Sequence, residues 1–215
     1  MMSRVLNFFK WSTYPCIVFG VAAAVLASGF AKRFGADKLS TMLGGKPLYM
    51  WALEATALCD YRAFVIRPEQ LGKYSLPEGV SVLVNRRADK GMSEALKLAV
   101  SWTPYQASGL LAVLGDMPFT KPVVQKLLKV FSETGAEAVA VGLDGKPMTP
   151  SVFSRGVFHR LLNLRGDVGA RAVLSEIKTV LVDVEEWMLL DIDKVEDLKE
   201  AEKRLELWRR LQHVD

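Results

Sequence analysis

The stretch Val-Ala-Ala-Ala-Val-Leu-Ala-Ser-Gly-Phe, residues 21–30, decides how the chain is read. Its first seven residues are small or branched and apolar, as in a parallel strand that is covered on both faces. The strand runs into a loop that contains Gly29, Arg33 and Lys38. A glycine-containing loop after a buried strand lets the backbone approach phosphate oxygens closely. The segment therefore predicts the first strand of an α/β domain, with a phosphate site at its carboxyl end.

The same apolar run could also be a membrane anchor. Residues 11–31 carry no charge and follow Arg4 and Lys10, and a run of this length can span a bilayer. A proline and two glycines interrupt the run, and its second half fits a strand equally well. We therefore predict a cytoplasmic protein without a membrane segment. Residues 1–20 are expected to form an extension ahead of a domain that spans residues 21–215.

Beyond the first strand, short β-branched runs alternate with helical patterns to the end of the chain. Further strands are expected at residues 63–66, 80–84, 110–114, 138–141, 179–183 and 188–192. Helices are expected at residues 48–57, 93–102, 121–134, 155–162 and 170–177, and a closing amphipathic helix begins at about Val195. This alternation is typical of strand-helix-strand units around a mainly parallel sheet.

The composition excludes several classes of protein. Apolar residues make up 50% of the chain and charged residues 24%, which is typical of a folded globular domain. The net charge is +4, but the charges are spread along the chain, so we expect no nucleic-acid partner. The two cysteines, Cys16 and Cys59, lack the spacing of a metal site and predict neither a disulfide nor zinc.

Two further segments carry residues that suit phosphate chemistry. Asp116 follows the apolar run 110–114, and ligands of open parallel sheets bind beyond the carboxyl ends of the strands. A carboxylate there suits Mg²⁺, although Asp and Pro at such a position are also typical of a plain turn. Ser93 is expected to cap a helix that begins at Glu94, and the free N–H groups of such a helix start could also bind an anion.

Taken together, these segments resemble the MobA-like NTP transferases. The pattern L-A-x-G-x-x-x-R-x-G-x-x-K at residues 26–38, followed by G-K-P-L at residues 45–48, is similar to the nucleotide loop of that family. G-D-M-P at residues 115–118 is similar to its metal-binding element, and G-D-V-G-A-R at residues 166–171 to a block of its cytidylyltransferase branch. The resemblance covers about residues 21–200 and ends near D-I-D at residues 191–193.

The resemblance implies a three-layer α/β/α fold of the nucleotide-diphospho-sugar transferase (Rossmann-like) type. It implies catalytic roles for Arg33, Lys38 and Asp116, and Mg²⁺ as the cofactor, held by Asp116 and Asp167. The residues that it implies in nucleotide binding are Leu26, Ala27, Ser28, Gly29, Arg33, Lys38, Asn85, Gly91 and Ser93. The expected reaction transfers CMP from CTP to the phosphate of molybdopterin, with release of pyrophosphate. A plain helix cap, for the helix expected from Ala170, is the alternative role of Asp167.

Two alternatives to this function stay open. Residues 31–33 and 37–38 look more like the guanylyltransferase branch, so GTP could replace CTP, and a sugar or polyol phosphate could replace molybdopterin. The chain could also be a non-catalytic accessory protein that delivers the cofactor to a molybdoenzyme or acts with a chaperone. Intact Arg33, Lys38 and Asp116 argue against that second class.

Overall fold

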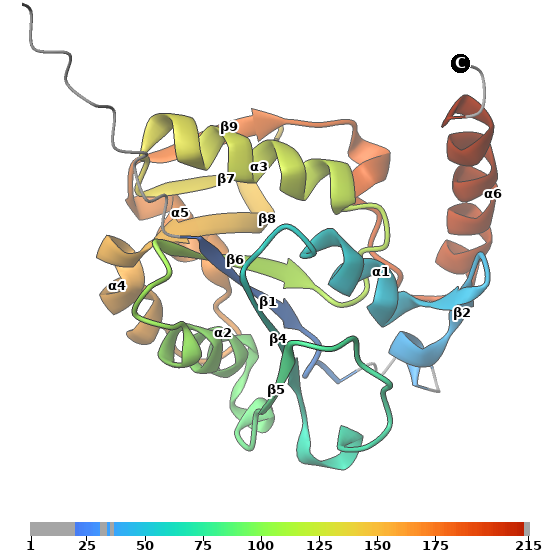
Figure 1. The fold of residues 1–215 in the computed structure, drawn as a ribbon, viewed down its shortest axis with the longest axis horizontal. Helices are drawn as coiled ribbons and strands as arrows, with labels where there is room; N and C mark the ends of the chain where they lie inside the picture. Colours follow the sequence, from blue (N-terminus) through green and yellow to red (C-terminus); the bar gives the residue numbers. More distant parts are fainter. Residues whose placement is uncertain (1–19, 31–33, 35–36, 213–215) are drawn as a thin grey trace, which may run out of the picture.

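A seven-stranded sheet forms the centre of the molecule (Figure 1). The structure, a computed structural model, describes residues 20–212 except residues 31–33 and 35–36. The strand order is β5-β4-β1-β6-β8-β7-β9, and β8 alone runs antiparallel to its neighbours. The strands are β1 (Val21–Leu26), β4 (Tyr61–Ile66), β5 (Val80–Val84), β6 (Gly109–Leu114), β7 (Ala138–Leu143), β8 (Lys146–Ser154) and β9 (Thr179–Asp183).

Helices cover both faces of this sheet, so the predicted three-layer fold is confirmed. One face packs against α1 (Leu48–Ala55) and α3 (Lys121–Thr134). The other face packs against α2 (Met92–Trp102), α4 (Phe158–Leu162) and α5 (Ala170–Glu176). Of the apolar run that could also be a membrane anchor, residues 11–19 lie outside the described residues, and residues 21–26 form β1 inside the sheet. Among the described residues, no helix has the length and apolar character needed to cross a membrane.

A third, smaller core joins the closing helix α6 (Val195–Gln212) to the sheet's carboxyl edge. It contains residues of α1 and α6, and it also takes in the hairpin of β2 (Met42–Leu43) and β3 (Lys46–Pro47), which the sequence patterns did not reveal. Gly44 and Gly45 form the turn of this hairpin with φ angles of +58° and +91°, a conformation that favours glycine at both positions. Figure 1 shows α6 at one side of the molecule, next to β2.

The antiparallel strand β8 was not predicted. It contains Pro147 and Pro150, and prolines argue against a central strand because they cannot donate a ladder hydrogen bond. The structure accommodates Pro150 at a bulge, where the register of β7 and β8 shifts between Ala140 and Val141. Bulges are among the few places in a sheet where proline is tolerated.

The strand expected at residues 188–192 is wrong. The segment instead contains the short 3-10 helix η5 (Glu186–Leu189) and then extended chain. The Ile192 N–H of this segment donates to the Asp116 carbonyl oxygen at 3.2 Å. The apolar side chains of this segment pack against cores at the carboxyl edge of the sheet, which explains an apolar run without a strand partner.

Candidate active site

The nucleotide loop begins where β1 ends. The N–H of Ala27 donates to the Val65 carbonyl oxygen at 2.9 Å, and the Leu26 carbonyl oxygen accepts from Gly115 at 3.0 Å. Leu26 and Ala27 are therefore tied into the sheet and can shape a site through their backbone. Gly29 is exposed, and no atom of the described residues other than its chain neighbours lies within 4 Å of the position that a Cβ would take there. This glycine leaves room for a ligand next to the chain.

Ser28 and Asn85 form a buried pair across the ends of β1 and β5. The Asn85 side-chain amide donates to the Ser28 Oγ at 3.0 Å, and the two residues are only 4% and 5% exposed. The Asn85 side-chain oxygen in turn accepts from the Arg87 N–H at 3.1 Å. Both residues are thus held by neutral hydrogen bonds. These bonds fix the start of the nucleotide loop, which contains Ser28, against the residue that follows β5.

Helix α2 follows Asn85 in the chain, and the prediction that Ser93 caps this helix is wrong. The helix starts at Met92, so Ser93 lies inside it, fully buried. Its N–H donates to the Gly166 carbonyl oxygen at 3.2 Å, while its Oγ has no partner within the described residues. Gly91 has a φ of +107°, and a Cβ there would lie 2.3 Å from the Gly166 carbonyl carbon. Only glycine allows the two backbones to lie so close.

Asp167 also belongs to this contact. Its Oδ1 accepts from the N–H of Met92 at 3.3 Å, so it pairs with the first backbone donor of α2. The cap predicted for the helix at Ala170 is wrong, because α5 has Gly169 at that position and no side-chain cap bond. The structure does not bring Asp167 into the group of carboxylates around Asp116.

That group consists of Asp116, Asp191 and Asp193. One carboxylate oxygen of each lies within 4.8 Å of one from each of the others. Lys38, at the start of the 3-10 helix η1 (Lys38–Ser40), places its Nζ 2.8 Å from Asp116 Oδ2 and 3.0 Å from Asp193 Oδ1. The predicted pair Lys38 and Asp116 is thus brought together beyond the ends of β1 and β6, the two central strands.

The charges in this group are unbalanced. Burial alone would lower the pKa of Lys38, but the attraction of Asp116 and hydrogen bonds to Asp116 and Asp193 raise it above its usual value. Lys38 is therefore a cation at neutral pH. Partial burial, followed by repulsion from Asp116, raises the pKa of Asp191 to about 7, although its carboxylate has a face open to solvent. Among the described residues, three carboxylates lie around one ammonium group, which is an excess of negative charge.

A divalent cation fits this excess charge. The Asp116 Oδ1 is buried and has no hydrogen-bond partner within the described residues. An unpaired buried carboxylate oxygen is costly unless a ligand satisfies it. Hard cations such as Mg²⁺ and Ca²⁺ prefer such oxygen donors, so Asp116, Asp191 and Asp193 are the residues that would hold one.

Two hollows adjoin the carboxylates. A cleft of about 730 Å³ is lined by Asp191 and, among others, by Leu143, Met148, Leu189 and Arg204. This volume lies within the range of small-molecule sites. The Arg204 guanidinium in its lining pairs with Glu200 at 2.8 Å, and the carboxylates of Glu185, Glu186 and Asp191 also line the cleft.

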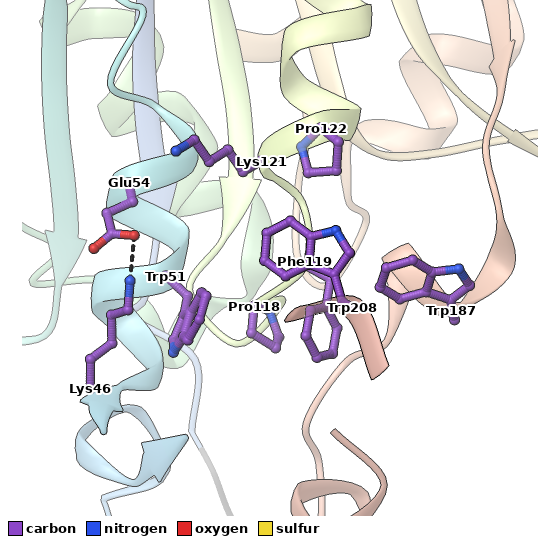
Figure 2. Close-up of a pocket in the computed structure, with 9 residues that line it drawn as sticks. All are labelled: Lys46, Trp51, Glu54, Pro118, Phe119, Lys121, Pro122, Trp187 and Trp208. Carbon is purple, nitrogen blue, oxygen red and sulfur yellow. Dashed lines mark hydrogen bonds and ion pairs between the residues drawn. The ribbon is translucent and has the colours of Figure 1, made fainter. Parts of the chain in front are cut away.

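A smaller pocket of about 200 Å³ lies between α1, α3, α6 and η5 (Figure 2). Its walls are aromatic, and Figure 2 shows Lys46 paired with Glu54 at one end. Pro118 and Phe119, two and three residues after Asp116, form part of it. The aromatic residues in its lining are Trp51, Phe119, Trp187 and Trp208. Its volume is below the usual range for a whole small-molecule ligand.

Sequence reasoning found part of this site. Arg33 lies outside the described residues, so the structure does not place it. Asp191 and Asp193 were not predicted as site residues, although the D-I-D segment that carries them was recognised. The hydrogen bond from Ile192 to Asp116, which ties this segment to the site, joins residues 76 positions apart. No local sequence pattern could therefore predict it.

Comparisons with known proteins agree with this geometry. Residues 23–180 match the model of the MobA-like NTP transferase domain. A Pyrococcus furiosus protein named "Probable molybdenum cofactor guanylyltransferase" is 29% identical over 196 residues, which cover 83% of this chain and 95% of that protein.

Two mycobacterial crystal structures are also similar. The Rv0371c homologue from Mycobacterium sp. strain JC1 superposes with a TM-score of 0.74 at 26% identity, over 86% of this chain and 98% of the other. The complex of Mycobacterium tuberculosis Rv0371c with manganese has a TM-score of 0.70 at 20% identity, with the same coverage of both chains.

Proposed function

Because this chain belongs to the family of MobA-like NTP transferases, we propose that this nucleotidyltransferase transfers GMP from GTP to the phosphate of molybdopterin. An oxygen of the acceptor phosphate forms a bond to the α-phosphorus, and the bond from that phosphorus to the β-phosphate oxygen breaks. Pyrophosphate leaves, and the product is a dinucleotide joined by a diphosphate. The observation that carries the proposal is the group of Asp116, Asp191 and Asp193 around Lys38.

Lys38 has the position and charge to act on the triphosphate. It is buried, it is held by two carboxylates, and it follows the nucleotide loop in the chain. Phosphoryl transfer depends mainly on positioning and on stabilisation of the charge that develops on the phosphates. We assign Lys38 to the charge that grows on the leaving pyrophosphate. Arg33, by its place in the family pattern, is proposed to share this role.

A divalent cation, proposed to be Mg²⁺, would be held by Asp116, Asp191 and Asp193 and would neutralise phosphate oxygens as the reaction proceeds. Without it, three carboxylates would repel a nucleotide triphosphate from this end of the site. The fold of the manganese complex of Rv0371c is similar to this one, so Mn²⁺ is tested beside Mg²⁺. Asp167, as a further metal ligand, is not needed in this proposal, because its carboxylate pairs with Met92.

The nucleotide is proposed to be GTP. The motifs favoured CTP, through the segments at residues 91–93, 115–118 and 166–171, but the relative from Pyrococcus furiosus carries a guanylyltransferase name and aligns over most of both chains. The segment at residues 166–171 has a structural role that explains it without CTP, since Gly166 and Asp167 pack against the start of α2. GTP therefore becomes the preferred substrate and CTP the alternative.

The acceptor is proposed to bind in the larger cleft beside Asp191. That cleft has apolar residues suited to a ring system and the Arg204 guanidinium suited to a phosphate, and the carboxylates of Glu185, Glu186 and Asp191 in its lining would need the bound cation to offset their charge. Its lining comes from the β7–β8 turn, η5 and α6. The strands β7 and β8 lie on the side of β6 away from β1, whereas α6 packs against β2, which follows the loop after β1.

Pyrophosphate release is the test. The purified chain is incubated with molybdopterin and GTP, CTP, ATP or UTP, each with Mg²⁺, Mn²⁺ or chelator. The proposal predicts release with GTP and a divalent cation, and none without the acceptor. Release that is faster with CTP would restore the cytidylyltransferase alternative. Release only with a sugar or polyol phosphate would reject the molybdopterin acceptor.

A further inference from the structure

Arg67 contacts the start of the nucleotide loop from the end of the neighbouring strand β4. Its Nη1 donates to the carbonyl oxygen of Gly29 and, at 3.4 Å, to that of Ser28. Its guanidinium carbon also lies 4.7 Å from the centre of the Phe30 ring. Its side chain is 19% exposed. One guanidinium thus fixes three consecutive residues of the loop, namely residues 28–30.

The turn that follows Arg67 contacts the other end of the same loop. The Gln70 Oε1 accepts from the Arg67 N–H at 2.8 Å, and the Gln70 Nε2 donates to the Tyr74 hydroxyl at 2.7 Å. That hydroxyl donates to the Asp37 Oδ1 at 3.1 Å. Asp37 directly precedes Lys38, whose Nζ lies against Asp116. A continuous set of hydrogen bonds therefore links the two ends of the loop through the 3-10 helix η2 (Pro68–Gln70).

Tyr74 is firmly placed for this role. Its ring lies 4.9 Å from that of Tyr49 and 5.3 Å from that of Phe64, which is fully buried in the main core. Burial, and then the charge of Asp37, raises the pKa of Tyr74. Its hydroxyl therefore remains a donor at neutral pH, and Asp37 is held by a group anchored in the sheet.

These contacts suit a site for an anion. Carbonyl oxygens that point at a triphosphate would repel it. Arg67 instead donates hydrogen bonds to the carbonyl oxygens of Ser28 and Gly29 from the β4 side. Loop ends that are fixed before binding also lose less conformational freedom when the ligand arrives. The same η2 segment orders residues at both ends, so Gly29 and Lys38 are set relative to each other.

We propose that Arg67 and Tyr74 are positioning residues for the nucleotide, acting through the two ends of the loop that carry Gly29 and Lys38. The proposal rests on the proposed nucleotidyltransferase function. Arg67 fixes the carbonyl oxygens at the first end, and Tyr74 fixes Asp37 at the second. Both lower the KM for the nucleotide and leave the bond-making step to Lys38, Asp116 and the bound cation.

The test compares Arg67→Met, Arg67→Lys and Tyr74→Phe with matched controls. Arg62→Met removes a guanidinium of β4 that donates to the Glu78 carbonyl oxygen, and Tyr49→Phe removes a hydroxyl that donates to the Ser75 carbonyl oxygen in the same aromatic cluster. Arg67→Met is expected to raise the KM for GTP about thirtyfold and Tyr74→Phe about fivefold, with kcat within about threefold of the wild type. Arg67→Lys is expected to restore part of the lost affinity. The controls are expected to keep the wild-type KM.

Two measurements separate this proposal from the function on which it rests. Calorimetric binding of Mg²⁺-GTP without acceptor reports the Kd even if no turnover occurs. Amide hydrogen exchange of residues 27–30 and 38–41 in the free protein needs no ligand at all. Faster exchange there in Arg67→Met and Tyr74→Phe, with unchanged unfolding midpoints, would support the proposal. Wild-type Kd and exchange in Arg67→Met would overturn it, as would a kcat that falls while KM stays constant.

Discussion

On one side of the sheet's carboxyl edge, Ser28 and Asn85 are buried and hydrogen-bonded to each other. On the other side, Asp116, Asp191 and Asp193 surround the single ammonium group of Lys38. The first region is satisfied by neutral partners from the chain itself. The second carries excess negative charge and a buried carboxylate oxygen without a partner within the described residues.

This difference separates two tasks within one site. The neutral region needs no ligand to be stable, so it can hold the loop and the start of α2 in place before a nucleotide binds. The charged region is costly without a cation, so its stability is linked to the ligand that it binds. The two regions should therefore respond in opposite ways to substitution, pH and divalent cations.

The largest effect is expected from Asp116→Asn. The amide keeps the size of the side chain but removes a charged ligand of the proposed cation, so kcat/KM should fall about a thousandfold, or about 4 kcal/mol of transition-state stabilisation. Pyrophosphate release under saturating Mg²⁺ measures this loss. Asp60→Asn, at an exposed residue that directly precedes β4 and so lies at the opposite edge of the sheet, is the control and should retain activity. Near-normal turnover of Asp116→Asn would end the proposed role of this carboxylate.

Lys38→Met is expected to reduce kcat about a hundredfold, because it removes one preorganised charge from the leaving group. It also leaves three carboxylates without their ammonium. Its unfolding midpoint without metal should therefore fall, and excess Mg²⁺ should restore part of the loss. Lys129→Met, which removes an exposed lysine of α3, should change neither quantity. An unchanged midpoint for Lys38→Met would mean that the carboxylates do not repel one another as described.

A pH dependence of smaller size is expected from Asp191. Its pKa is raised to about 7 in the folded protein, first by burial and then by Asp116. The folded state therefore binds this proton more tightly than the unfolded state, whose carboxyl titrates near pH 4. Stability without metal should fall as the pH rises from about 4 to about 7.

Thermal unfolding of the wild type and of Asp191→Asn across this range measures the effect. The part of the slope that Asp191→Asn removes belongs to Asp191. Because a proton competes with a cation for the same oxygens, Mg²⁺ should also bind more weakly below about pH 7 in the wild type. Identical slopes in the two proteins would show that Asp191 titrates at its ordinary pKa.

The smallest effect is expected from Ser28→Ala in the neutral region. The substitution removes the acceptor for the Asn85 amide and should cost about 1–2 kcal/mol of unfolding free energy. Urea unfolding measures this cost, which should not change with Mg²⁺ or between pH 5 and pH 8. A cost that depends on Mg²⁺ would mean that the two regions are not independent.

An element could be predicted from the sequence where its pattern is local, and could not where it depends on contacts between distant parts of the chain. Strands such as β1 and β6 were predicted because four buried apolar residues in succession leave a local pattern. Strand β8 was not predicted, because Pro150 argues against a strand. The proline is explained only by the bulge at which it lies. The strand predicted at residues 188–192 was wrong for the opposite reason. The apolar side chains of this segment are partly or fully buried, although the segment is not a strand.

The site shows the same limit. Lys38 and Asp116 each follow a recognisable strand, so their motifs could be identified. Asp191 and Asp193 follow no strand directly, and they join the site only because Ile192 bonds to the backbone of Asp116. Asp167 lies between glycines like a ligand of the metal, but its position against Met92 is fixed by packing that no motif contains.

Transfer of label from GTP tests the central claim most directly. The wild-type chain is incubated with GTP labelled at the α-phosphate, molybdopterin and Mg²⁺, and the products are separated. We predict that the label moves into a molybdopterin guanine dinucleotide, with one pyrophosphate released for each transfer. Label that stays in GTP, or that appears as free GMP, would contradict the claim that this chain joins a nucleotide to a phosphorylated acceptor.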